Sequence, residues 1–210
     1  PEEGNTIYLD NAGGNDANNG ESEATAVKTF NKALELLGEN GTLKVKSFDK
    51  SSDIVFNKKG TLEIIEDITL KGTETAVGIT MKSGSHLRMA EGKTLKMKEF
   101  KRALVIEEGA ELNDGYYILE NNAPDEHGRG LNIMGTVKGS SGRDKLVIKA
   151  NDKYNVNFYT ATAVFENATI EVISQKRVWS DAKKLTMTNT SMTLSGYGQG
   201  FYIGGDSKII

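Results

Sequence analysis

One stretch of the sequence carries the residue types that acid–base chemistry uses. Residues 121–130 read NNAPDEHGRG and hold Asp125, Glu126, His127 and Arg129 close together. Hydrolysis of a glycosidic bond needs two carboxyl groups held at a defined separation, and two neighbouring residues of a loop hold such a pair poorly. A solvated loop is the simpler interpretation. His127 and Arg129 remain candidate ligand-binding residues, because loops on rigid scaffolds often carry function.

A second stretch is rich in cations that could meet an acidic polysaccharide. It comprises Lys93, Lys96, Lys98, Lys101 and Arg102. A lyase acting on such a polymer abstracts a proton next to a carboxylate, so it needs a base and stabilisation of the developing enolate. The lysines flank Leu95 and Met97, which makes the run read more simply as the outer face of a β-strand. No catalytic residue is predicted, and enzymatic activity stays open as the less favoured alternative.

The segment 10–20, DNAGGNDANNG, offers closely spaced oxygen ligands of the kind found in calcium loops. It does not match the EF-hand frame, and it occurs once, whereas nonapeptide calcium repeats need tandem copies. Asn, Asp and Gly also favour turns for conformational reasons alone. We therefore predict no bound metal and no cofactor, with a calcium loop as the alternative.

Aromatic residues accumulate late in the chain and could serve as platforms for sugar rings or protein partners. They are Tyr116, Tyr117, Tyr154, Phe158, Tyr159, Trp179, Tyr197, Phe201 and Tyr202. In a strand where Phe201 and Ile203 face inward, Tyr202 faces outward, and Trp179 follows Val178 in the same way. Trp179, Tyr197 and Tyr202 are candidate ligand-binding residues, although some of the rings could instead stack along the fold.

The stretch 79–114 indicates the scaffold that positions these residues. It repeats a pattern of an apolar, a polar and an apolar residue followed by a turn. Ile79 and Met81 precede Ser-Gly-Ser, and Leu104 and Ile106 precede a turn at Glu-Gly-Ala. Such short strands, without the Asn-Gly turns of two-residue hairpins, suit a coil that stacks on its own next turn. The prediction is an all-β solenoid, a right-handed single-stranded parallel β-helix of about six or seven coils. A jelly roll or sandwich is the alternative.

The same alternation predicts which side chains face the interior. The inward residues are expected to be Leu104, Ile106, Leu131, Ile133, Leu185, Met187, Phe201 and Ile203. The outward residues are expected to be Glu107, Lys138, Thr186 and Tyr202.

One amphipathic helix is predicted, over residues 26–37. Val27, Phe30, Leu34 and Leu37 form a single apolar stripe, and Gly38 follows at the C′ position. A β-helix end exposes unpaired backbone and the apolar interior of its first coil. The helix is therefore expected to cap the N-terminal end.

Composition excludes several classes of protein. The formal net charge of -3 over 210 residues argues against a nucleic-acid partner, for which a basic face is expected. No run reaches the roughly 18 apolar residues of a membrane span, and the first residues do not form a signal peptide. With no cysteine there is neither a disulfide framework nor a thiolate metal site.

The first residues carry a resemblance to a known family. The segments concerned are Ile7-Tyr8-Leu9-Asp10, Gly14-Asn15-Asp16, Asn18-Asn19-Gly20, residues 24–30 (ATAVKTF) and Ala33-Leu34. This opening resembles the start of secreted right-handed parallel β-helix proteins of the pectate-lyase-like superfamily, where a strand, an Asn/Asp/Gly loop and one helix precede the coils. Lyases of that superfamily usually combine an Arg or Lys base with aspartates that hold calcium. Residues 69–112 of this chain, which include the cationic stretch, contain no Asp.

The resemblance implies one domain, in which residues 1–48 supply the strand, loop and capping helix and residues 49–210 form the coils. Because the chain stops within one copy of the repeating strand pattern, we expect a monomeric fragment of a longer protein. A secreted, acidic, cysteine-free solenoid is most similar to part of a Gram-positive bacterial surface protein. The expected location is extracellular, with attachment to the cell surface through another part of the protein.

Three functions follow from these expectations. The leading one is a non-enzymatic surface module, an adhesin or stalk domain, whose partner is a host or cell-surface glycan or protein. The first alternative is a polysaccharide lyase or glycoside hydrolase on a β-helix. The second is a phage receptor-binding spike.

Overall fold

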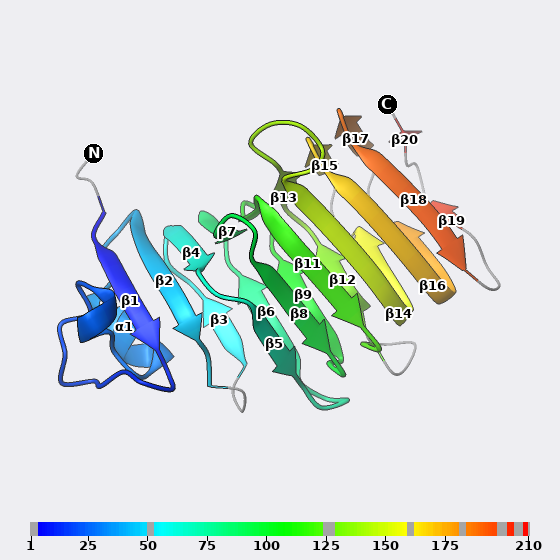
Figure 1. Cartoon of the computed structure of the whole chain (residues 1–210). Coiled ribbons are helices and arrows are strands. Elements are labelled where there is room, and N and C mark those ends of the chain that lie inside the picture. Colours follow the sequence, from blue (N-terminus) through cyan, green and yellow to red (C-terminus); the bar gives the residue numbers. More distant parts are fainter. Residues whose placement is uncertain are drawn as a thin grey trace.

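A computed structural model describes residues 4–49, 53–123, 129–158, 162–180, 184–196, 201–203 and 208–209. All strand pairs in these ranges are parallel. The chain winds as a parallel β-solenoid of about five turns, fewer than the six or seven expected. Figure 1 shows the strands stacked in sequence order, from blue β1 to the orange strands. The predicted parallel β-helix is confirmed.

A nine-stranded sheet forms one wall of the solenoid. In order of pairing its strands are β1 (Thr6–Asp10), β2 (Gly41–Ser47), β4 (Gly60–Ile64), β7 (Ser85–Met89), β10 (Glu111–Leu112), β13 (Thr136–Lys138), β15 (Thr162–Glu166), β17 (Lys184–Thr188) and β20 (Lys208–Ile209).

An eleven-stranded sheet forms the remaining wall and is bent into two faces. The first face contains β5 (Ile68–Lys71), β8 (Thr94–Lys98), β11 (Gly115–Glu120) and β18 (Ser191–Gly196). The second face contains β3 (Ile54–Phe56), β6 (Val77–Met81), β9 (Arg102–Ile106), β12 (Arg129–Ile133) and β19 (Phe201–Ile203). The long strands β14 (Leu146–Phe158) and β16 (Thr169–Ser180) run through both faces, since β11 and β12 pair with different parts of β14.

The core is built from columns of identical or similar side chains at matching positions of successive turns. One column in the nine-stranded sheet consists of Leu43, Leu62, Leu87, Leu112, Val137 and Phe165, which are register partners in turn and fully buried. Burying each such side chain contributes about 1.5–3 kcal/mol. The column therefore sets the register of the turns, because a slip by one residue would expose it.

The predicted inward register is confirmed where side chains are described. Leu104 pairs with Leu131 and Ile106 with Ile133, and all four are fully buried. Leu185 is buried and Met187 packs, partly buried, against the core. The predicted outward residues Glu107, Lys138 and Thr186 are half-buried or exposed. The side chains of Phe201, Tyr202 and Ile203 lie outside the described part of the chain.

The N-terminal helix is shorter than predicted. Helix α1 spans Phe30–Leu36, and a single 3₁₀ turn, η1, spans Glu23–Thr25. Val27 does not join the helix because it forms an isolated parallel bridge with Leu9 of β1. Its amide donates to the Tyr8 carbonyl and its carbonyl accepts from the Asp10 amide. Long-range pairing thus overrides the helical periodicity of residues 26–29.

Helix α1 covers the N-terminal end of the solenoid, beside β1 in Figure 1. Ala33 is fully buried in the same apolar cluster as the strand columns, and Leu37, just after the helix, is also buried there. Phe30 packs partly buried against this cluster, with its ring centroid 6.2 Å from that of Phe48. The helix therefore acts as the expected cap.

The Thr29 hydroxyl should be required for a well-formed cap. It accepts from the Lys32 amide at 3.2 Å and donates to Asp16 Oδ2 at 2.8 Å. Thr29→Ala removes both contacts, and we expect the free energy of unfolding in urea to fall by about 1 kcal/mol. Thr29→Ser keeps the hydroxyl and should stay close to the parent protein. Equal losses in the two variants would contradict a capping role.

Candidate functional site

The predicted aromatic site is placed only in part. Trp179 lies in β16 and Tyr202 in β19, and their Cα atoms are register partners on these paired strands. Their side chains, like Tyr197 as a whole, lie outside the described part of the chain. The backbone thus brings two of the three candidates onto neighbouring strands.

The predicted loop site is likewise only partly described. Arg129 begins β12, where it is the register partner of Arg102 in β9. Its side chain and the whole of His127 lie outside the described residues, as do Asp125 and Glu126. A ligand-binding role for His127 and Arg129 stays a prediction.

Two residues of the cationic stretch lie on the outer face of a strand, as its alternation indicates. Lys96 and Lys98 are half-buried outward residues of β8, between the fully buried Leu95 and Met97. Lys96 Nζ lies 2.8 Å from Glu120 Oε2 and Lys93 Nζ lies 2.8 Å from Glu66 Oε2. Acidic neighbours therefore offset these positive charges.

The carboxylates of the 10–20 loop are occupied by the chain itself. Asp10 Oδ1 accepts from the amides of Ala12 and Gly13 at 3.1 Å and from the Ser47 hydroxyl at 2.7 Å. Desolvation opposes ionisation of Asp10, but these hydrogen bonds and Lys46 hold its pKa below the usual value. In the described ranges, no three His, Asp or Glu side chains are grouped so that they could hold a metal ion.

A buried polar cluster occupies the bend between the two faces of the eleven-stranded sheet. Asn122 and Asp152 are both fully buried. Asp152 Oδ1 accepts from the Asn122 backbone amide at 2.8 Å and from its Nδ2 at 3.0 Å, while Asn122 Oδ1 accepts from the Phe100 amide. Desolvation raises the pKa of Asp152 to about 6, against the hydrogen bonds from Asn122, and the charge of Glu120 adds to the rise. Asp152 lies inside strand β14.

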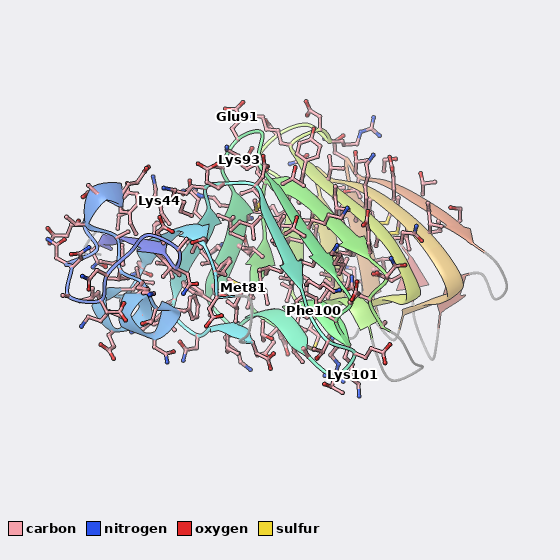
Figure 2. The ribbon with its side chains drawn as sticks, turned by 60° about the horizontal axis from the view of Figure 1, so that its bottom comes forward. Lys44, Met81, Glu91, Lys93, Phe100 and Lys101 are labelled. Carbon is pink, nitrogen blue, oxygen red and sulfur yellow. The ribbon has the colours of Figure 1, made fainter. Side chains whose placement is uncertain are left out.

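One hollow on the described surface follows from unequal corner lengths. Between the nine-stranded sheet and the first face, the chain turns at 90–93 after β7 and at 139–145 after β13. The turn between them, after β10, consists only of Asn113 and Asp114. Glu91 and Lys93 project at the outer edge in Figure 2, and the 139–145 loop rises above the strands in Figure 1. A short corner between two longer ones leaves a depression.

Two adjoining hollows, of about 380 and 530 Å³, make up this depression, which we call the corner groove. They share Arg88 and Asp114. The first is otherwise lined by Thr61, His86, Glu111, Asn113, Lys138, Gly139 and Ser140. The second is otherwise lined by Glu63, Met89, Ala90, Glu91, Gly92, Gly115, Tyr116, Asp144 and Lys145.

Several charged side chains of the corner groove are paired across neighbouring strands. Arg88 Nη2 and Nε donate to Glu63 Oε2 at 2.6 and 3.1 Å. His86 Nδ1 lies 3.3 Å from Glu111 Oε2. His86 lies within strand β7 and its side chain is half-exposed. These pairs hold the groove's polar groups in defined positions.

Hydrogen bonds from outside and from inside the solenoid hold the short corner, Asn113 and Asp114, at the floor of the groove. Asp114 Oδ1 accepts from the Ser140 amide at 2.8 Å and Oδ2 from the Ser140 hydroxyl at 2.6 Å. From inside, the fully buried Tyr117 places its hydroxyl 3.1 Å from the Asn113 carbonyl and 3.3 Å from that of Asp114. Burial, and then the charge of Asp114, raise the pKa of Tyr117 well above its usual value, so the hydroxyl stays a donor.

Tyr116 supplies the aromatic surface of the groove. It alternates with Tyr117 on β11, faces outward and is 42 % exposed. Gly115 before it has φ +151°, and a Cβ there would lie 2.4 Å from Met89 Cγ, so the close packing beneath Tyr116 requires glycine. The sequence marks Tyr116 only as one of several aromatics, because the groove depends on which corners become neighbours.

No protein-family model matches the chain, and no curated protein or solved structure is significantly similar to it. None of the described helices is long and apolar enough to cross a membrane.

Proposed function

We propose that this chain is a non-enzymatic extracellular surface module, an adhesin or stalk domain that presents a glycan- or protein-binding face. The corner groove is the observation that carries the proposal. It is a preformed hollow on a wall whose strands are hydrogen-bonded on both sides, so little ordering is required when a ligand binds.

The chemistry of the groove fits binding better than catalysis. Its arginine and histidine each face a carboxylate partner, and Asp114 is held by Ser140. Catalytic acids and bases are usually groups with shifted pKa values that can reach a substrate. Asp152 has such a pKa, but it is fully buried and does not line the groove.

The opening of the chain supports the extracellular part of the proposal. Its strand, Asn/Asp/Gly loop and capping helix resemble the start of secreted proteins of the pectate-lyase-like superfamily. The absence of cysteine and the acidic composition are compatible with a Gram-positive surface protein. The partner in that setting is a host or cell-surface glycan or protein.

An array of glycans and host proteins, paired with a turnover assay, tests this function. We expect binding to at least one array component. We also expect no unsaturated product from polygalacturonate, alginate, hyaluronan or chondroitin in the presence of calcium. Steady turnover that is lost on changing Lys96, Lys98 or Arg102 would overturn the proposal in favour of a lyase. A trimer in sedimentation would favour a phage spike.

A further inference from the structure

We propose that the corner groove binds a neutral oligosaccharide, with one sugar ring stacked on Tyr116 and its hydroxyl groups bonded to Arg88 and Asp114. This inference rests on the proposed binding function and names the ligand class of that site.

Tyr116 and its polar neighbours supply the two kinds of contact that a sugar ring makes, an aromatic face and hydrogen-bonding groups. The exposed face of an aromatic ring packs against the C–H face of a sugar, while the hydroxyl edge needs donors and acceptors. Arg88 uses two N–H groups for Glu63, remains 49 % exposed and has further N–H groups to donate. Asp114 accepts one bond at each oxygen from Ser140, and a carboxylate has about four acceptor sites.

The charge of the groove disfavours an anionic sugar and is compatible with a neutral one. Around Tyr116 the lining includes four carboxylates, Glu63, Glu91, Asp114 and Asp144, against two cations, Arg88 and Lys145. Arg88 is already paired with Glu63. A uronate or sulfate group placed here would meet an excess of negative charge, which disfavours binding.

The groove also suits a chain of sugars better than an extended peptide. Besides the corners and β11, its lining comes from β4, β7, β10 and β13, which are successive strands of one sheet and span about 14 Å. A peptide that binds by strand addition needs an open sheet edge. Here β7 is paired on one side with β4 and on the other with β10, so no such edge is offered.

Calorimetric titration of the 210-residue chain tests this assignment. The neutral probes are cello-, malto- and manno-oligosaccharides and N-acetylglucosamine oligomers, and the anionic probes are galacturonate and heparin oligosaccharides. We expect at least one neutral series to bind more tightly than both anionic ones. Tyr116→Ala should weaken that binding roughly tenfold, the scale of losing one aromatic contact, and Tyr116→Phe should retain it.

Tyr8→Ala is the matched control, because Tyr8 is an outward tyrosine of β1 outside the groove lining, with Lys44 Nζ 5.7 Å from its ring. Its affinity should equal that of the parent. The assignment is wrong if anionic probes bind best, if no neutral probe binds, or if the two alanine variants are equal. Array binding that survives Tyr116→Ala would overturn the groove assignment and leave the surface-module function standing, whereas polysaccharide turnover would overturn that function itself.

Discussion

Leu104→Asp is expected to abolish or nearly abolish the folded state. Leu104 lies in β9 between its register partners Ile79 and Leu131, and all three side chains are fully buried. A carboxylate at this position would be surrounded by apolar side chains. The expected loss is about 4 kcal/mol or more, out of the roughly 5–15 kcal/mol that stabilises a typical domain. Urea denaturation followed by circular dichroism measures it.

Thr69→Asp is the matched control for that variant. Thr69 is an exposed outward residue of β5 whose register partner is Lys96, so the same new charge lies at the surface beside a cation. Its stability should stay within about 0.5 kcal/mol of the parent. An unchanged melting temperature for Leu104→Asp would show that the register of β9 is wrong.

The second large effect is a dependence of stability on pH that comes from Asp152. Its pKa is 3.8 in the unfolded chain and about 6 in the folded protein, where burial disfavours the charge. Below pH 3.8 both states carry the proton and the burial costs nothing. Between pH 3.8 and 6 only the unfolded state releases the Asp152 proton, so the free energy of unfolding falls as pH rises. Above pH 6 this loss of stability is complete, at about 3 kcal/mol.

Asp152→Asn should remove this loss, because an amide stays neutral and its oxygen can still accept from Asn122. We expect the variant to gain about 3 kcal/mol relative to the parent on going from pH 3.5 to pH 7.5, measured by urea denaturation at both values. Asp53→Asn, at an exposed carboxyl, should show no such gain. If the free energy of unfolding of Asp152→Asn differed from that of the parent by the same amount at both pH values, ionisation of a buried carboxyl would be contradicted.

The sequence by itself determined the parallel β-helix architecture and several of its inward-facing residues. Alternation of apolar and polar residues assigns Leu104, Ile106, Leu131 and Ile133 to the inside, and the structure buries all four. This works because a strand has a period of two and each turn has one apolar interior, so local pattern and burial agree. The capping helix is also visible as a stripe, although its start at Phe30 is not.

Only the tertiary structure decided the features that depend on stacking. Val27 leaves the predicted helix because β1 offers it a backbone partner that is distant in sequence. Asp152 is polar, yet it is fully buried inside β14, where Asn122 of the preceding turn donates to it. Local pattern contains no signal for either, because the partners come from other turns of the solenoid.

The corner groove has the same origin. The lengths of the corners at 90–93, 113–114 and 139–145 can each be read from the sequence once strands are assigned, but none of them forms a hollow alone. Stacking places the short corner between the two longer ones, and Tyr116 then lies in the depression that they leave. In a solenoid each turn contacts mainly the turns before and after it. The shape of the surface therefore depends on differences between neighbouring turns, and only stacking decides which corners become neighbours.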